Sequence, residues 1–419
     1  MGKGLIGGGF MGLIEVFVTW MGVFVSFVLF LYILILLYAF LSRAEPLKFN
    51  IGNGGSFEDL PMISVIVPAY REREFLPRVL KLISDLKYPR NRLQVILALE
   101  TDDYETIDAL RKCCKVLVKE ENDLPCFVEF NGLGVEIVYN GSGFRSKPAA
   151  LNEAFKKVRG NIVGVYDAED LPHPDHLLTA VSLLQSLRDK SVVAVQFARF
   201  MNHFWVNRLS KGQAAEYEVY FKHVGPALCR LTGLPAIAGS AFFVFRDVLE
   251  EVGGWDPKMP TEDLDLTFKL GSKGYKVVVA EPAAGTEAVL GLRALLAQRA
   301  RWVRGGFLVA FRALKAFPRS CPLLIIAVLM PLCSILGQTW LLLPFLGVDV
   351  DPIVFTLPFV FSVFSYALTA KLAVNPEGKV PGRYVLVIAA VYTLAVWKAV
   401  FELLTKPYCW NKTPRVKMS

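Results

Sequence analysis

The chain has 419 residues, of which 54% are hydrophobic and only 20% are charged, and its formal net charge is +8. Soluble domains usually carry about 45–50% apolar and about 25% charged residues. This composition excludes a disordered, collagen-like or acidic-tail protein. The apolar excess must come from membrane spans or from an unusually rich core.

The first predicted element is a membrane-spanning helix. Between residues 10 and 41 the only charged side chain is Glu15, and this stretch exceeds the roughly 20 residues needed to cross a bilayer. A secretory signal peptide has a shorter apolar core and a small-residue cleavage site, and neither is evident. Residues 1–49 are therefore interpreted as an uncleaved transmembrane anchor.

Residues 50–287 have the composition of a soluble domain. Short β-branched runs at residues 62–68, 93–99, 136–139 and 162–166 alternate with helical patterns at 75–87, 147–158 and 176–187. This alternation predicts a Rossmann-like α/β domain, with a sheet covered by helices on both faces. Ligands of such sheets bind outside the carboxyl ends of the strands.

Acidic side chains follow three of these strands. The first strand is followed by Tyr70 and Glu72, the second by Glu100 and Asp102, and the fourth by a third acidic cluster that begins at Asp167. Solvated loop acids would explain any one cluster. Three clusters at one sheet edge indicate a site for a hard cation and a nucleotide.

The third cluster is the predicted metal site. Asp167 and Glu169 are two residues apart and can face one divalent ion, and Asp170 is an alternative to Glu169. Oxygen ligands with open positions favour Mg²⁺ or Mn²⁺, whose shell nucleotide phosphates usually complete. The seven cysteines show no metal-binding spacing and fit a reducing cytoplasm.

Two further motifs have both a structural and a functional explanation. The glycine-rich residues 141–146 lead into a helix at Lys147, which is either an anion cradle or an ordinary capped turn. At residues 261–265, Thr261 can cap a helix whose first turn holds Glu262 and Asp263. The same acids could instead supply a general base.

Apolar segments return near the end of the chain. Residues 288–320 contain seven basic residues and no acid, which predicts an amphipathic interface helix, and residues 321–374 hold two apolar spans. The positive-inside rule places the soluble domain in the cytoplasm.

In residues 375–419, Lys398 and Glu402 break the last apolar run, so we favour an interfacial helix and three spans, with four as the alternative.

The motifs together resemble a known family. In order they are VPAYRE, ETDD, SKPAALN, YDAED, TED and QRARW, the last of the form QxxRW, and they span residues 63–305. This set resembles the membrane-bound family-2 glycosyltransferases, which include cellulose, chitin and hyaluronan synthases and ceramide glucosyltransferase. The resemblance implies a GT-A fold and an inverting transfer from a nucleotide sugar.

The resemblance also implies a role for each matching residue. Asp263 would be the catalytic base, and Asp167 and Glu169 would hold the metal, although Glu169 stands where the family's DxD motif has a second Asp. The residues implied in nucleotide binding are Pro68, Tyr70, Glu72, Glu100, Asp102 and Lys147. Those implied at the acceptor and diphosphate are Gly239, Ser240, Glu262, Gln298, Arg301 and Trp302.

The tail after the last helix has two interpretations. Trp410, Lys412 and Thr413 resemble the gating loops of polysaccharide synthases, but an aromatic and basic tail could equally serve as a membrane anchor.

The number of spans bears on the acceptor. Three or four helices form a groove rather than a closed tunnel, which favours a polyprenyl or dolichyl phosphate-linked acceptor, and GDP-mannose is the favoured donor. The alternatives are a processive polysaccharide synthase that uses a UDP-sugar and a nucleotide-sugar-binding membrane protein without catalysis. We expect a multi-pass plasma-membrane protein whose basic segments face lipid rather than nucleic acid. The oligomeric state stays open.

Overall fold

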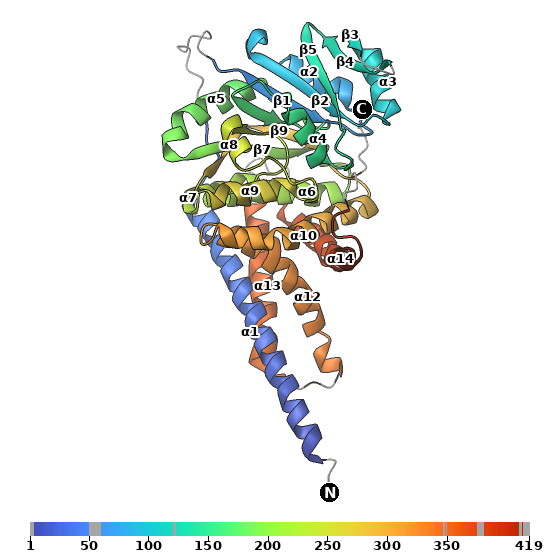
Figure 1. Ribbon diagram of the computed structural model, residues 1–419. Coiled ribbons are helices and arrows are strands. Elements are labelled where there is room, and N and C mark those ends of the chain that lie inside the picture. Colours follow the sequence, from blue (N-terminus) through green and yellow to red (C-terminus); the bar gives the residue numbers. More distant parts are fainter. Residues whose placement is uncertain are drawn as a thin grey trace.

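The computed structural model describes residues 4–49, 60–119, 123–346, 348, 350–374, 381–409 and 413, with side chains described from residue 15 onward. An α/β domain stands above a group of long helices that extend away from it (Figure 1). This arrangement confirms the predicted combination of a GT-A-like sheet domain with apolar helices.

The α/β domain is built on one mixed sheet. Within the described residues its nine strands follow the order β3-β4-β5-β2-β1-β6-β8-β7-β9. The strands are β1 Ile63–Pro68, β2 Leu93–Leu99, β3 Lys115–Lys119, β4 Pro125–Phe130, β5 Leu133–Tyr139, β6 Ile162–Val165, β7 Val192–Asn202, β8 Phe242–Phe245 and β9 Lys276–Glu287. Strands β5, β2, β1 and β6 are parallel, so their carboxyl ends share one edge.

The four predicted strands are confirmed as β1, β2, β5 and β6, although β5 begins three residues earlier than expected. Strands β3, β4, β7, β8 and β9 were not predicted from the sequence. Of these, β4 and β8 each run antiparallel to both of their neighbours, and so make the sheet mixed. Strand β1 is almost entirely buried, as expected for a central parallel strand covered on both faces.

Helices cover the sheet and shape its edge. They are α2 Leu76–Ser84, α3 Tyr104–Cys113, α4 Lys147–Phe155, α5 His176–Leu187, α6 Arg208–Glu218, α7 Gly225–Leu231, α8 Arg246–Glu251 and α9 Glu262–Ser272. Short 3-10 turns η2 Arg90–Arg92 and η4 Arg188–Lys190 and a π-helical segment η5 Val219–Val224 connect some of them. In α2 the buried residues Val79, Leu80 and Ile83 recur at helical spacing, so one face of the helix packs on the sheet.

The remaining helices form the apolar part. They are α1 Gly4–Ser42, α10 Leu292–Lys315, α11 Cys321–Leu324, the π-helical η6 Ile325–Leu329, α12 Met330–Trp340, η7 Leu343–Leu346, α13 Pro352–Leu372, η8 Gly382–Tyr384 and α14 Val385–Thr405. Four described segments, at residues 15–42, 321–345, 352–372 and 382–405, are long and apolar enough to cross a membrane. The first of the two spans predicted within residues 321–374 is one segment that contains the π-helical η6.

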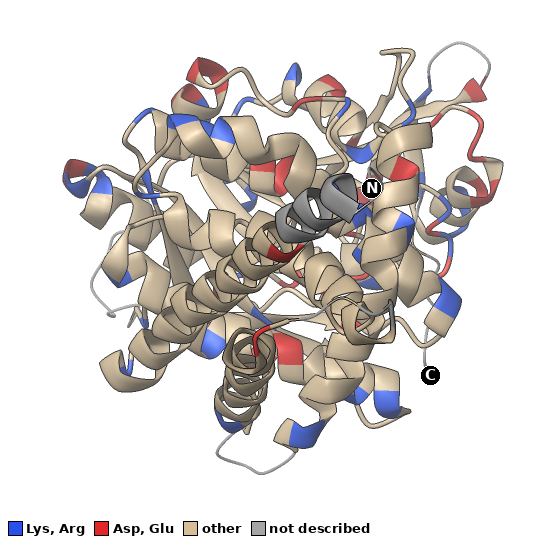
Figure 2. Cartoon of the chain, turned by 90° about the horizontal axis from the view of Figure 1, so that it is seen from below, with Lys and Arg blue, Asp and Glu red and all other residues tan. Residues whose placement is uncertain are grey.

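Helices α1, α12 and α13 extend together from the α/β domain, and α10 lies crosswise above them (Figure 1). Gly22 of α1 leaves room for Trp340, because a Cβ at Gly22 would lie 2.5 Å from its ring. Seen from below, these helices carry few charges, and the basic and acidic segments gather mainly around them (Figure 2).

Helix α14 is placed differently. It has the length and apolarity of a span, yet it lies at the level of α10 rather than beside the descending helices (Figure 1). Ala395, Val396 and Ala399 of α14 pack with Ala300 and Val303 of α10. This packing suits the interfacial helix predicted for this segment, and the number of spans stays a prediction.

A buried ion pair joins α10 to the end of α14. The Arg304 side chain is 2% exposed, forms an ion pair with Glu402, and donates a second hydrogen bond to the backbone oxygen of Cys409. Lys398 approaches Glu402 from the more open side, with 2.6 Å between Nζ and Oε1. Arg304 therefore fixes both α14 and the start of the tail to α10.

We predict that Arg304→Met destabilises the protein far more than Lys398→Met. Arg304→Met removes the buried cation, leaves Glu402 with only the half-exposed Lys398, and removes the bond to the Cys409 oxygen, so its cost should approach the about 3–5 kcal/mol of a broken buried pair. Lys398→Met leaves the pair of Arg304 and Glu402 in place and should cost about 0–1 kcal/mol. Thermal unfolding of both variants in detergent tests this difference. Equal melting temperatures for the two variants would contradict it.

Candidate active site

One cavity collects most of the predicted residues. It has a volume of about 630 Å³, lies at the carboxyl ends of the parallel strands and continues between the long helices. The predicted residues that line it are Pro68, Tyr70, Glu72, Glu100, Lys147, Asp167, Glu169, Gly239, Glu262, Asp263, Gln298, Arg301, Trp302 and Thr413.

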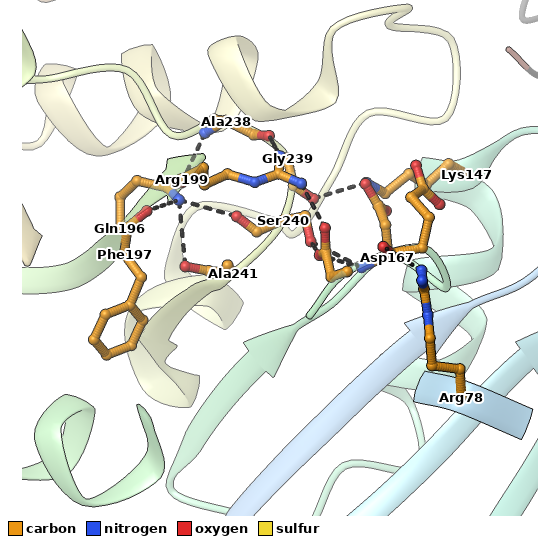
Figure 3. Close-up of polar contacts among 12 residues, drawn as sticks. Arg78, Lys147, Asp167, Gln196, Phe197, Arg199, Ala238, Gly239, Ser240 and Ala241 are labelled. Atoms are coloured by element: carbon orange, nitrogen blue, oxygen red, sulfur yellow. Dashed lines mark hydrogen bonds and ion pairs between the residues drawn. The ribbon is translucent and has the colours of Figure 1, made fainter. Parts of the chain in front are cut away.

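Lys147 lies at the centre of the polar end of this cavity. Ser146 caps α4 by accepting a hydrogen bond from the Ala149 N–H at 3.3 Å, which places Lys147 in the first turn. The Lys147 Nζ lies 2.6 Å from Asp167 Oδ1 and 3.4 Å from Glu262 Oε1, and it donates to the Gly239 oxygen at 2.7 Å (Figure 3). Burial lowers the pKa of Lys147, but the two carboxylates outweigh it and raise the pKa, so the side chain stays charged.

Asp263 is the carboxylate whose protonation is most strongly affected. Its removal from bulk water and the neighbouring charge of Glu262 raise the pKa of Asp263 to about 7, while Lys147 acts in the opposite direction. At neutral pH, a carboxylate with such a pKa is deprotonated in about half of the molecules, and the deprotonated form can accept a proton. Asp263 thus has the properties of a general base.

The loop after β6 presents Asp167 and Glu169 to the cavity while Asp170 holds the loop in place. One oxygen of the buried Asp170 accepts a bond of 2.5 Å from Arg199, and the other accepts from the Asp167 N–H at 2.9 Å and from the Ser240 hydroxyl (Figure 3). Both oxygens of Asp170 are therefore engaged, which favours Glu169 as the second metal ligand.

Arg78 supports the same loop from the opposite side. Its guanidinium donates to the backbone oxygen of Glu169 at 3.2 Å and forms an ion pair of 2.6 Å with the buried Glu287. His203 also contacts Glu287, at 3.0 Å. The position of Glu169 therefore depends on a buried charge network that comes from α2, β9 and the segment after β7.

The donor set fits Mg²⁺ or Mn²⁺ only together with a nucleotide. The described residues contain no group of three or more His, Cys, Asp or Glu side chains that could hold a metal alone. Two carboxylates that face a cavity with open positions suit an ion whose shell is completed by phosphate oxygens and water.

Two predicted residues lie outside the cavity lining. Asp102 is half-exposed and pairs with Arg145, whose guanidinium lies over the Tyr70 ring at 5.6 Å from its centroid. Ser240 is fully buried, and its hydroxyl accepts from the Asp167 N–H at 2.8 Å. Asp102 therefore belongs to the rim, and Ser240 positions Asp167 rather than facing an acceptor.

Two predicted gating residues, Trp410 and Lys412, lie outside the described residues.

The expected cap of α9 is absent. Thr261 stands at the N-cap position but its side chain makes no capping bond, and Thr261 Oγ1 is buried without a hydrogen-bond partner among the described residues. Gly305 of α10 packs directly on it, since a Cβ at Gly305 would lie 2.2 Å from Thr261 Oγ1. The hydroxyl belongs to a residue that lines the cavity, where a bound ligand can satisfy it.

The QxxRW segment is anchored through Arg299, which sequence reasoning did not single out. Its guanidinium carbon lies 3.9 Å from the Trp302 ring centroid, and its amino group lies 2.5 Å from Glu216 of α6. Arg301 donates to the Pro260 oxygen at 2.7 Å, just before α9. Arg78, Arg199 and Arg299 were missed because their partners are distant in sequence, so no local spacing marks them.

Comparison with known proteins identifies the family. A family model described as glycosyltransferase like family 2 matches residues 61–305, which is more than half of the chain. The chain belongs to this family. The matched segment runs from the strand β1 region through the QxxRW motif of α10, so it contains all the carboxylates that line the cavity.

Two curated relatives illustrate the range of this family. The chain is 30% identical over 251 residues to a β-monoglucosyldiacylglycerol synthase of Nostoc sp., covering 59% of this chain and 49% of the relative. It is 27% identical over 303 residues to the UDP-forming cellulose synthase catalytic subunit of Pseudomonas fluorescens, covering 69% and 38%. The chain thus spans about half the length, or less, of these relatives.

A solved structure shares the fold. It is a mannosyltransferase from Pyrobaculum calidifontis in complex with GDP-Man and Mn²⁺, with a TM-score of 0.57 and 19% identity. The similarity covers 92% of this chain and 99% of that chain, so it extends beyond the sheet domain to the apolar helices.

We predict that Gly239→Ala lowers turnover by about 10²-fold, the scale of loss that follows a displacement of about 1 Å at a reacting group. Gly239 has a φ of +75°, and a Cβ there would lie 2.8 Å from Asp263 Oδ2, so alanine must displace that carboxylate. The release of nucleoside diphosphate from a nucleotide sugar measures turnover. Gly141→Ala is the matched control because a Cβ at Gly141 meets nothing within 4 Å. Similar losses in both variants would contradict the prediction.

Proposed function

We propose that the protein is a membrane-embedded inverting glycosyltransferase that moves a hexose from a nucleotide sugar to a lipid-linked acceptor on the cytoplasmic side of the plasma membrane. The observation that carries this proposal is the single cavity that joins Lys147, Asp167 and Asp263 to the space between α1, α12, α13 and α14. A donor can enter from the sheet end and an acceptor from the helix end.

The polar end of the cavity suits the departure of a nucleoside diphosphate. Lys147 is held protonated there, and Arg301 lines the same cavity. A divalent ion held by Asp167 and Glu169 would supply further neutralisation of the developing diphosphate charge. Fixed charges of this kind stabilise the leaving group more than water does, because they need no reorganisation during the reaction.

Asp263 serves as the base in this proposal. An acceptor hydroxyl attacks the anomeric carbon from the face opposite the diphosphate and passes its proton to Asp263. The bond between the anomeric carbon and the phosphate oxygen breaks, and its electron pair leaves with the diphosphate, so the configuration inverts. Gln298, which lines the same cavity, can orient the acceptor.

The relatives guide the choice of donor and acceptor. GDP-mannose is the first donor to test, since the structurally similar mannosyltransferase binds GDP-Man, whereas the cellulose synthase relative is UDP-forming. The Nostoc relative makes a glycolipid, which supports a lipid acceptor. A processive synthase that uses a UDP-sugar is the second candidate. It is less favoured because so few long helices form a groove rather than a closed tunnel for a growing polymer.

Incubation of membranes with a panel of radiolabelled nucleotide sugars tests the proposal. The products are partitioned into lipid and polymer fractions. Label in the lipid fraction supports the proposed function, and long polymer without a labelled lipid would favour the processive synthase. Donor binding without release of nucleoside diphosphate would indicate a non-catalytic binding protein.

We predict that kcat/KM falls about tenfold per pH unit below pH 7 and levels off above it. Asp263 must be deprotonated to act as the base, its pKa is about 7, and kcat/KM reports the free enzyme. Asp263→Asn should lose at least about 10²-fold in turnover, retain donor binding and show no such pH dependence. A wild-type pH profile in the variant would show that another group is the base.

We predict that EDTA abolishes transfer and that added Mn²⁺ or Mg²⁺ restores it. Asp167 and Glu169 would repel the negatively charged diphosphate unless a cation lies between them. Turnover should therefore require the ion that these carboxylates and the phosphates hold together. Asp167→Asn should raise the metal concentration needed for half-maximal activity, whereas Asp102→Asn, at the rim, should leave it unchanged. Full activity after EDTA treatment would exclude a metal-dependent transfer.

A further inference from the structure

The half of the cavity between the long helices has a hydroxyl-lined wall. Ser362, Ser365, Tyr366 and Thr369 of α13 all line it, and their spacing of i, i+3, i+4 and i+7 places them on one helix face. Phe359, Val360, Val363 and Phe364 are exposed on the other faces of the same helix, where they are 49–64% exposed. The helix therefore turns a polar stripe inward and an apolar surface outward.

Neighbouring helices extend this polar wall. Tyr32 of α1 lines the cavity, and Thr393 of α14 lines it as well. Apolar side chains such as Leu29, Ile326 and Val385 lie among them. The wall can thus contact both the hydroxyl groups and the hydrocarbon of an amphiphile.

Charge is distributed very differently along the cavity. The cations that line it, Arg145, Lys147, Arg199 and Arg301, all come from the α/β domain or α10. Among the described residues, no Lys or Arg lines the part formed by α1, α12, α13 and α14. Glu216 of α6 also lines the cavity, and it is paired with Arg299 and accepts a hydrogen bond from the Tyr392 hydroxyl.

This distribution disfavours an anionic headgroup. A phosphate in a low-dielectric site needs a cation or several N–H donors to replace its lost hydration. Hydroxyl side chains instead exchange hydrogen bonds with hydroxyl or ester oxygens at little cost in desolvation.

Resting on the function proposed above, we infer that the acceptor is an uncharged lipid with a free hydroxyl, such as a diacylglycerol or a glycosyl-diacylglycerol, and that the α13 stripe binds its headgroup. The hydroxyl oxygen of this lipid would form the new bond to the anomeric carbon, and its proton would pass to Asp263. This acceptor differs from the polyprenyl phosphate-linked lipid that the number of helices alone favours.

The hydroxyls also have a purely structural explanation, which a matched pair of variants can separate. Ser and Thr in membrane helices often bond to the carbonyl four residues earlier. Thr369 does so to Ser365 at 2.7 Å, and Thr356 does so to Pro352 on the same helix. Thr369 lines the cavity, whereas Thr356 is exposed and does not.

The acceptor test uses the full chain in vesicles. The donor is the nucleotide sugar that the radiolabelled panel described above identifies as the substrate. Dioleoylglycerol, glucosyl-dioleoylglycerol and a polyprenyl phosphate, free or bearing one sugar, are offered separately, and the lipid products are identified by mass spectrometry. We expect product from the uncharged lipids alone. Product from the polyprenyl phosphates alone, or polymer alone, would overturn the inference while leaving sugar transfer established. Absence of product from every acceptor would defeat the proposed function together with the inference.

The variant test measures KM for lipid and for donor separately. Thr369→Val and Tyr366→Phe should each raise the lipid KM by about 2- to 10-fold, the effect of one lost hydrogen bond, and leave the donor KM unchanged. Thr356→Val, which removes the same back-bond outside the cavity, should change neither. Equal effects of Thr356→Val and Thr369→Val, or no effect of Thr369→Val and Tyr366→Phe, would show that the stripe does not bind the acceptor.

Discussion

The site depends on a buried ammonium group that is shared between carboxylates. Asp167 from the loop after β6 converges with Glu262 and Asp263 from the first turn of α9, about a hundred residues later, and like charges so close would repel one another. Lys147 removes this repulsion, and its bond to the Gly239 oxygen adds a third loop to the same point. One cation therefore sets the relative positions of the loop that carries Asp167, the first turn of α9 and the segment at Gly239.

Helix α10 has a comparable role at the boundary between the two parts of the molecule. Arg312 near its end pairs with Asp256 and Asp265, which fixes the helix that carries Asp263, while Arg304 fixes α14. Between them, Gly305 allows close contact with Thr261. The helix that carries QxxRW is thus attached to the base on one side and to the lipid-facing helices on the other, so their geometry is coupled.

The sequence predicted the local features well and the distant ones poorly. The strands β1 and β2 and the acids that follow them could be found because burial and strand ends leave a pattern over a few residues. The networks of Arg78, Arg199 and Arg299 could not be predicted from the sequence, since each arginine pairs with a residue tens to hundreds of positions away. The hydroxyls of α13 were visible at helical spacing, but only the cavity shows that they face inward. The missing cap of Thr261 reflects the tight contact with Gly305, which no local pattern reveals.

The position of the cavity's helix end has a kinetic consequence. Under the proposed function, an acceptor that arrives between α1 and α13 would diffuse in two dimensions, so its supply would be set by its mole fraction in the bilayer rather than by its amount per volume of solution. Dilution of the membrane with inert lipid would then slow the reaction at constant total acceptor, while dilution of the aqueous phase would affect only the donor. The aqueous phase would thus supply the donor and the bilayer would supply the acceptor, although the two substrates would meet at one carboxylate.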